Sequence, residues 1–235
     1  ASQFTAVIML FLAISPIIYG YILEKTNVKK MLINSSIILF ITNIFLGLAT
    51  SYELFLFFRV IEALVVPAIL TSLMSILANI DKENIKFNMS IYVASTVFGG
   101  LVGRILSGFI ATNLSYEFVF YSLSLAILVS IYFISKLSYE GEATISKPKI
   151  TDVMEILKDK RFLIIYFLMF CVFFVFSGVL NILPFRVKEI SSNVSEFQIS
   201  LLYLGYGMGI LISLNSSKIV KFFKNELNTI LFGLI

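Results

Sequence analysis

Between Phe162 and Pro184 the chain reads FLIIYFLMFCVFFVFSGVLNILP, an apolar run without a single charged side chain. A helix needs about 20 apolar residues to cross roughly 30 Å of hydrocarbon, and this run is long enough. The rest of the chain has the same character: of its 235 residues, 59% are hydrophobic and only 14% are charged. Soluble domains carry about 25% charged residues, so the composition indicates a membrane protein.

Similar apolar runs recur along the chain and are separated by short polar turns. Their length predicts membrane-spanning helices, because the strands of an outer-membrane barrel would give alternating segments of about 10 residues. The expected fold class is an all-α membrane protein. Since the chain opens at Ala1 without Met or a signal peptide and stops early in its last run, a fragment truncated at both ends is expected. The expected spans are residues 5–23, 32–49, 54–79, 89–112, 118–137, 162–184 and 198–216, with another beginning at 228.

The basic residues predict how these helices are oriented. Lys and Arg of short loops stay on the cytoplasmic side of a membrane. Only Arg186 and Lys188 fall in loops of the opposite side, while Arg59 and Arg104 lie inside predicted spans. The net charge of +4 is therefore attributed to topology and not to nucleic-acid binding. The predicted cytoplasmic set is Lys25, Lys29, Lys30, Lys82, Lys86, Lys136, Lys147, Lys149, Lys158, Lys160, Arg161, Lys218, Lys221 and Lys224.

A long polar segment divides the chain. It predicts an N-terminal half bundle of five spans (1–137), a cytoplasmic connector (138–161) and the start of a C-terminal half bundle (162–235). In the connector, ITDVMEILKDKR places Ile150, Val153 and Leu157 on one face of an expected amphipathic helix, with a simple solvated linker as the alternative. The stretches ISPIIYGYILEKTNVKK and ISLNSSKIVKFFKNELN resemble each other weakly, as in parallel repeats.

The first motif is GYILEKTNVKK, at the turn after the first span. Gly20 is followed by Glu24, Lys25 and Lys29, and Asn27 lies within the same turn. The alternative is that the lysines only accompany the cytoplasmic end of a helix.

The second motif is FFRVIEALVVPAI, in the third span. Arg59 and Glu62 are three residues apart and project from one side of the helix. Ionisable groups inside a membrane are costly, which makes both residues functional candidates. The alternative for Arg59 is that its long side chain reaches the headgroups.

The third motif is FGGLVGRILSGF, residues 98–109. Gly99, Gly103 and Ser107 recur every four residues and predict a smooth face on which another helix approaches closely, either as a sliding surface or as a static groove. Arg104 lies beside this face, and Gly108 follows it.

Together the three motifs resemble those of the major facilitator superfamily. The family patterns are G-x-x-x-D-R-x-G-R-R, R-x-x-Q-G and G-x-x-x-G-P-x-x-G-G. Here Glu24 and Lys25 replace the first charged pair, Glu62 replaces the Gln, and Arg104 replaces the proline. Asn27 stands where the first pattern has its second glycine, and because Asn tolerates the left-handed conformation, the tight turn that the resemblance implies is expected to be kept. The resemblance covers the whole chain and implies family helices two to nine, in a major-facilitator-type bundle of two pseudo-repeated halves.

The resemblance implies secondary active transport by alternating access, in a bacterial cytoplasmic membrane and without a cofactor. Proton-coupled efflux of a small organic solute is expected, and nutrient or sugar uptake by the same fold is the alternative. The implied partners are a small-molecule substrate, protons and membrane lipids, and the implied state is a monomer. A channel or a structural bundle is the alternative from another class. An enzyme or a metal site is not expected, since the chain has no histidine and a single cysteine, Cys171.

The site residues follow from these motifs and from polar residues inside spans. Asn43, Asn181 and Tyr203 are candidates for the substrate cavity. Glu62 and Arg104 both lie roughly 12 Å below the outer boundary, so Glu62 is expected to hold Arg104, with Arg59 as a competing partner. Alternatively, Arg104 faces a water-filled cavity and binds an anionic substrate directly. The resemblance implies that Gly20, Glu24 and Lys25 form a latch that stabilises the outward-facing state. Leucine at position 20 is then expected to crowd the neighbouring helix.

Overall fold

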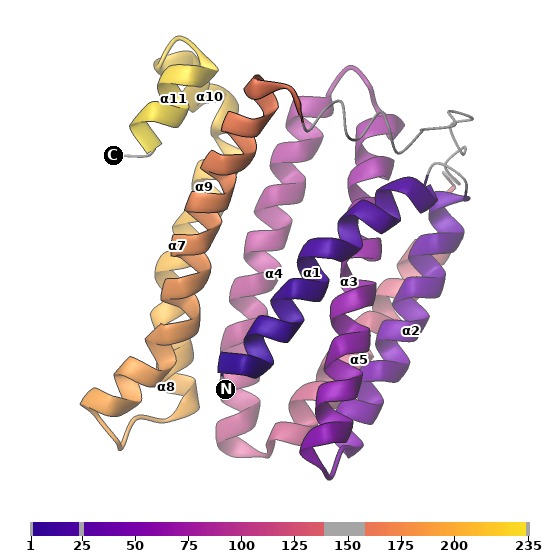
Figure 1. Cartoon of the computed structure of the whole chain (residues 1–235), viewed down its shortest axis with the longest axis vertical. Coiled ribbons are helices and arrows are strands. Elements are labelled where there is room, and N and C mark those ends of the chain that lie inside the picture. Colours follow the sequence, from indigo (N-terminus) through magenta and orange to yellow (C-terminus); the bar gives the residue numbers. More distant parts are fainter. Residues whose placement is uncertain (1, 24–25, 139–157, 234–235) are drawn as a thin grey trace.

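The structure is a computed structural model that describes residues 2–23, 26–138 and 158–233. All regular elements within these ranges are helical (Figure 1). They are α1 (Ser2–Leu23), α2 (Val28–Leu48), α3 (Tyr52–Ile80), α4 (Ile85–Asn113), α5 (Tyr116–Ser135), α7 (Lys160–Ile190), α8 (Glu196–Leu201), the 3-10 helix η1 (Leu202–Gly207), α9 (Met208–Leu214), α10 (Ser216–Phe222) and α11 (Glu226–Gly233).

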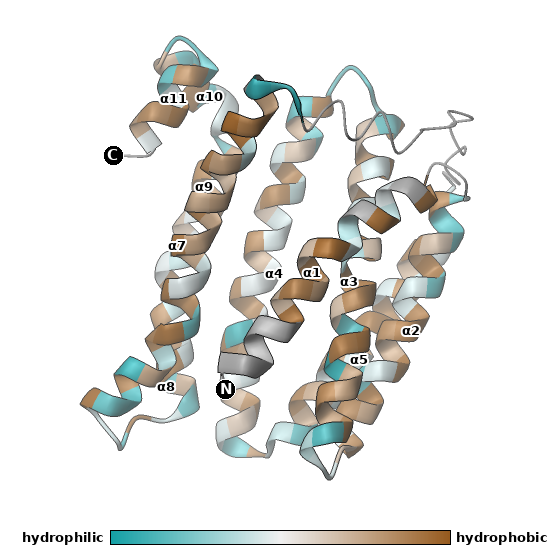
Figure 2. Cartoon of the chain, viewed as in Figure 1, coloured by the Kyte–Doolittle hydropathy of each residue, from teal (hydrophilic) through white to brown (hydrophobic). Residues whose placement is uncertain are grey.

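Six stretches of helix are long and apolar enough to cross a membrane, which confirms the expected fold class. They correspond to the predicted spans two to seven, and apolar residues predominate along most of their length (Figure 2). The first predicted span forms α1, whose described apolar stretch, Ile8–Gly20, is shorter than the six. The six stretches are Val28–Leu48, Tyr52–Ile80, Ile85–Asn113, Tyr116–Ser135, Phe162–Ile190 and Glu196–Leu214.

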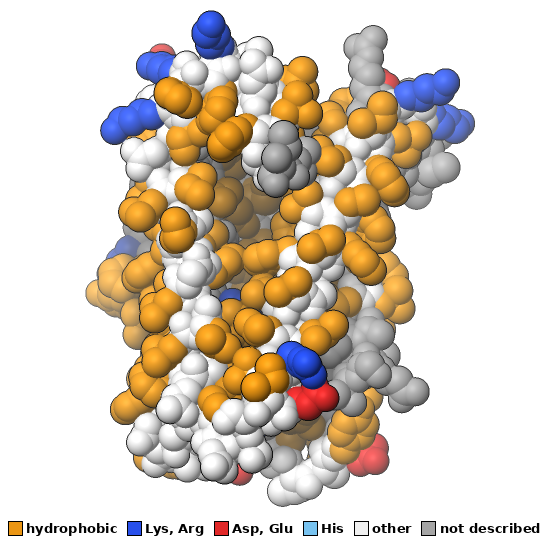
Figure 3. Space-filling view, turned by 90° about the vertical axis from the view of Figure 1, so that its left-hand side faces the viewer, with side chains coloured by type: hydrophobic (Ala, Val, Ile, Leu, Met, Phe, Trp, Pro, Cys, Tyr) orange, Lys and Arg blue, Asp and Glu red, His pale blue; other side chains and the backbone are white. Residues whose placement is uncertain are grey.

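Consecutive long helices run in opposite directions, so the turns alternate between two ends of the bundle (Figure 1). Lys and Arg side chains gather at the upper end of the face seen in Figure 3, as expected for the cytoplasmic end. Apolar side chains cover much of the middle of that face, as expected of a bundle surrounded by lipid, and a basic and an acidic side chain lie together in its lower part.

Asn27 has a different role from the one expected. Its φ of −64° and ψ of 119° are extended, and its side chain accepts a hydrogen bond of 2.9 Å from the Lys30 backbone N–H. Asn27 is therefore the N-cap of α2, and the predicted left-handed turn is wrong. The amide oxygen satisfies a backbone donor that the first turn of a helix leaves free, a role for which Asn is among the preferred residues.

Two predicted spans differ from the helices that form. α7 continues through Pro184 to Ile190, because a proline inside a membrane helix is tolerated when its surroundings satisfy the freed carbonyl. The expected span 198–216 is divided into α8, η1 and α9, with Gly205 and Gly207 in the tighter 3-10 segment. The predicted amphipathic helix of the connector falls mainly on residues 139–157, which lie outside the described residues.

In the first half of the chain, α2 packs against α3 and α5, and α1 packs against α3. Buried hydroxyls in these helices bond to the carbonyl of their own preceding turn, as Ser36 does to Leu32 O at 2.8 Å. Val28, Leu32 and Ile76 form a small apolar cluster at the expected cytoplasmic end. Close packing therefore holds the helix pairs at fixed distances.

Gly47 allows a close approach between α2 and α5. A Cβ atom built there would lie 2.9 Å from Cζ of Tyr121 and overlap its ring. We expect Gly47→Ala to destabilise the protein by about 1–3 kcal/mol, measured as a lower thermal-unfolding midpoint in detergent. Gly20→Ala is the control, because nothing among the described residues lies within 4 Å of a Cβ at Gly20. An equal loss in both variants would contradict this packing. A leucine at position 20 extends well beyond its Cβ, so the crowding expected of a larger residue there stays a prediction.

Candidate functional site

One long contact joins the two predicted halves. We call it the seam: α4 on one side, and α8, η1 and α9 on the other. At one end the Phe197 backbone N–H donates to Thr112 Oγ1 at 3.0 Å, and at the other Ser213 Oγ donates to Ser90 O at 2.9 Å. The seam therefore extends through most of the membrane thickness.

The face of α4 that forms the seam is offset by one residue from the face predicted. A Cβ built at Gly108 would lie 2.6 Å from Ser200 Oγ, and one at Gly100 would lie 3.7 Å from the Tyr206 ring. In contrast, a Cβ at Gly99 or at Gly103 would meet nothing within 4 Å in the described structure. The predicted Gly99 and Gly103 face is therefore not the packed one. Ser107, the third residue of that predicted face, is half-buried.

Arg59 and Glu62 pair with each other within α3. The guanidinium Nη1 donates to Glu62 Oε2, one turn further along the helix, and the side chains are 32% and 16% exposed. Glu62 is thus a partly buried carboxylate inside a membrane span with a cation as its direct partner.

Arg104 forms no ion pair with Glu62, so the predicted pairing of these residues is wrong. Its Nη1 donates to Gly100 O at 3.0 Å, on the preceding turn of α4. Its Cζ lies 5.0 Å from the ring centroid of Tyr203 and 5.9 Å from that of Tyr206, both on η1. Intrahelical pairing of Glu62 with the nearer Arg59 leaves Arg104 to these aromatic faces.

The tyrosines of η1 also contact α7. The Tyr203 hydroxyl donates to Leu180 O at 3.1 Å, and the Tyr206 ring lies 5.5 Å from that of Phe176. Tyr203, predicted as a cavity residue, is 9% exposed. The Arg104 site is therefore built by α4, η1 and α7 together.

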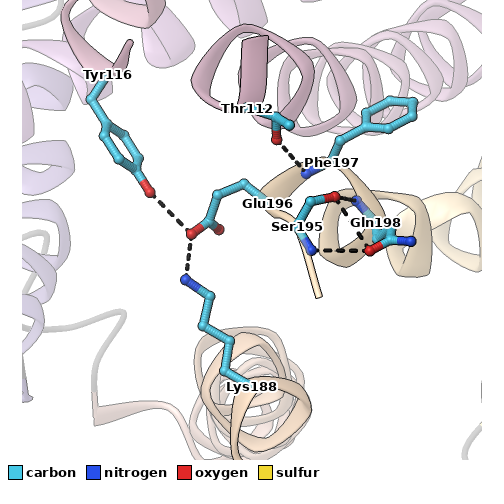
Figure 4. Close-up of polar contacts among 7 residues, drawn as sticks. All are labelled: Thr112, Tyr116, Lys188, Ser195, Glu196, Phe197 and Gln198. Carbon is cyan, nitrogen blue, oxygen red and sulfur yellow. Dashed lines mark hydrogen bonds and ion pairs between the residues drawn. The ribbon is translucent and has the colours of Figure 1, made fainter. Parts of the chain in front are cut away.

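A polar cluster connects three helices at the expected outer end of the seam (Figure 4). Glu196 Oε1 accepts a hydrogen bond of 3.0 Å from the Tyr116 hydroxyl and pairs with the Lys188 ammonium. Ser195 and Gln198 form a capping box that fixes the first turn of α8 beside Glu196. Sequence reasoning missed this cluster, although Ser-Glu-Phe-Gln before an apolar run is a signal for a helix start.

This outer cluster leads to a prediction about local opening. We expect Glu196→Gln to raise deuterium uptake at residues 195–201 about two- to fivefold, the range for losing a partly exposed ion pair. The control is Glu189→Gln, because Glu189 pairs with Arg186 of its own helix at 2.7 Å and holds no other helix. Hydrogen exchange by mass spectrometry measures both. Equal uptake in the two variants would show that the cluster does not hold α8.

The expected cytoplasmic end of the seam has polar contacts of its own. Lys86 Nζ lies 2.8 Å from Glu226 Oε1, and this hydrogen bond holds the pKa of Glu226 below its ordinary value. Ser90 Oγ and Ser216 Oγ lie 2.8 Å apart. Both ends of the seam are thus closed by polar contacts in this conformation.

The first motif is described only in part, because Glu24 and Lys25 lie outside the described residues and the predicted latch is untested there. Lys29 Nζ donates to Leu137 O at 2.6 Å, just beyond the end of α5. A cation at the C-terminal end of a helix is favoured by the free carbonyls and the helix dipole. Lys29 therefore connects two helices of the same half.

The two predicted asparagines differ in their surroundings. Asn43 is 1% exposed, its Nδ2 donates to Leu39 O at 2.9 Å, and its Oδ1 has no partner in the described structure. Asn181 lines a groove of about 950 Å³ between α1 and α7. Phe170, Phe173 and Phe174 form much of the same wall. Only Asn181 is therefore at an open surface large enough for an organic molecule.

Comparison with known proteins supplies one match. The family model described as Major Facilitator Superfamily matches residues 1–235. No curated protein and no solved structure matches the chain. The family match agrees with the helical membrane fold described above.

Proposed function

Because this chain belongs to the Major Facilitator Superfamily and is a multi-pass secondary transporter rather than an enzyme, we propose that it exports a small organic solute in exchange for protons. The groove between α1 and α7 is the observation that carries the choice of solute. Its volume of about 950 Å³ is at the upper end for sites that take drug-sized molecules.

The lining of this groove favours an organic solute over a sugar. Three phenylalanines line it, whereas Ser177 and Asn181 are its only uncharged polar side chains among the described residues. The Asn181 Nδ2 is already engaged with Ser177 O at 2.8 Å. A sugar would bury many hydroxyls without partners here, each at a cost of about 1–3 kcal/mol.

Glu62 supports proton coupling. It is the one carboxylate of the described spans that lies more than two turns from either end of its helix, and Arg59 is its partner. Protonation of Glu62 removes its charge and frees Arg59 to change partners. The protein thus contains a group whose charge can follow the transport cycle.

The seam supports the proposed organisation into halves. Its contacts join residues before 138 to residues after 161, so the halves 1–137 and 162–235 meet along α4 while the connector 138–161 links them in sequence. Movement of the two halves along the seam would open the protein to one side of the membrane and then to the other.

We propose a monomer in a bacterial cytoplasmic membrane, with lipid around the apolar surface.

Counterflow in proteoliposomes of the full-length protein tests this proposal. We expect lipophilic organic solutes to exchange without a gradient, and an imposed pH gradient to drive net movement. Glucose and lactose serve as the sugar comparison. Sugar flux equal to that of the organic solutes, or organic flux that ignores the pH gradient, would overturn the proposed solute or the proposed coupling respectively.

A further inference from the structure

We propose that Arg104, with Tyr203 and Tyr206, binds the negatively charged group of the transported solute, so that the substrate is an organic anion. The inference rests on the proposed transport function and specifies the substrate class. It concerns the seam, where α4 and η1 meet. The Tyr203 hydroxyl there bonds to Leu180 O, between Val179 and Asn181 of the groove lining, so one solute can reach both places.

The hydrogen-bond capacity of Arg104 is mostly unused. A guanidinium has five N–H donors, and the structure engages one of them, through Nη1 to Gly100 O at 3.0 Å. No carboxylate of the described residues lies within ion-pair distance of it. The remaining donors form the fork that binds a carboxylate or a phosphate through two parallel hydrogen bonds.

Charge balance inside the membrane points the same way. Arg59 and Glu62 neutralise each other, which leaves Arg104 as an uncompensated cation well inside a span. A charge in this position is costly, and intramembrane arginines of this kind characteristically serve an ion or substrate pathway. A bound anion would remove the imbalance in the same way as a carboxylate of the protein.

The two tyrosines orient the guanidinium and add a further donor. The Tyr203 ring lies 5.0 Å from Arg104 Cζ and is itself anchored by its hydroxyl, which donates to Leu180 O. The Tyr206 ring lies 5.9 Å from the same atom, and its hydroxyl has no hydrogen-bond partner in the described structure. That hydroxyl is free to donate to an anion held by Arg104.

Tyr203 and Tyr206 belong to η1, on the second half, whereas Arg104 belongs to α4, on the first. An anion that contacts Arg104 and Tyr206 together would therefore connect the halves across the seam. Binding at such a place depends on the relative position of the halves, which is what alternating access requires.

Thermal stabilisation of the purified full-length protein by matched probes tests the anion site. The probes are benzoate, 1-naphthoate and octanoate, each compared with its uncharged amide, and benzylammonium as the cation of similar size. We expect at least one carboxylate to raise the unfolding temperature more than its amide, and benzylammonium to give no shift. No difference between every acid and its amide, or an equal shift with benzylammonium, would overturn the proposal.

Variants assign the effect to Arg104. Arg104→Gln is expected to remove the carboxylate shift, while Arg104→Lys keeps the charge without the fork and is expected to weaken binding at least about tenfold. Tyr206→Phe is expected to give a smaller loss. Lys82→Gln is the control for charge alone, since Lys82 lies in an exposed turn. A carboxylate shift that survives in folded Arg104→Gln would also refute the proposal.

Transport assays separate this inference from the proposed function. If a carboxylate binds through Arg104 but its flux ignores the pH gradient, the coupling fails and the anion site stands. If proton-driven flux is found only for cations or uncharged solutes, the anion site fails and the proposed exchange stands.

Discussion

Alanine at position 108 is expected to separate α4 from α8 and to stop transport, whereas alanine at position 103 is expected to have little effect. The Cβ atom of Gly108→Ala would lie 2.6 Å from Ser200 Oγ, 2.7 Å from Ser200 Cβ and 2.9 Å from Glu196 O. The last atom belongs to the backbone, so rotation of one side chain cannot relieve the overlap. The helices must move apart, at a cost of about 1–3 kcal/mol.

Gly103→Ala is the matched control, because it adds the same methyl group to the same helix and meets nothing within 4 Å in the described structure. The unfolding temperature and the rate of counterflow measure both variants. We expect a lower unfolding temperature and lost exchange in Gly108→Ala only. If Gly103→Ala were instead the more damaging change, the face predicted from the sequence motif would be the one that moves during transport.

The second large effect is expected from Glu62→Gln, which should abolish proton-driven transport and leave exchange without a gradient intact. Glutamine has nearly the shape of the protonated acid but cannot release a proton, so the coupling step is lost while solute binding remains. Accumulation driven by a pH gradient should fall at least about tenfold, the change expected when one coupling free energy of about 1.4 kcal/mol is removed. Counterflow of the same solute is the parallel measurement.

Glu53→Gln is the control for Glu62→Gln, because Glu53 belongs to the first turn of the same helix, near the expected membrane boundary. Proton-driven flux should persist in this variant. Unchanged proton-driven flux in Glu62→Gln would place the coupling group elsewhere.

Exchanging the charges within α3, by Arg59→Glu with Glu62→Arg, should restore stability lost in either single variant, since their pairing is direct.

The sequence alone determined the membrane class, the approximate spans, their alternating direction and the family. The first three depend on quantities summed over a segment, namely the length of an apolar run and the number of lysines in a loop, whereas the family resemblance depends on three short motifs. Such quantities change little when the limits of a segment shift by a few residues, as the predicted span 54–79 and the helix Tyr52–Ile80 show. The motif residues Arg59, Glu62 and Arg104 were identified in the same way, because a charge inside an apolar run is conspicuous without any structure.

Only the tertiary structure decided which residues meet. One residue turns a helix by about 100°, so the sequence could not distinguish the face of Gly99 and Gly103 from that of Gly100 and Gly108 until a neighbouring helix was in place. For the same reason, Glu62 and Arg104 do not meet, although both were expected at the same depth in the membrane. Depth fixes only the position along the helix axis, whereas a contact also requires that the two side chains point toward each other. The cluster of Tyr116, Lys188 and Glu196 could not be predicted for a related reason. Tyr116 precedes Glu196 by 80 residues, and the three side chains become neighbours only where α5, α7 and α8 converge.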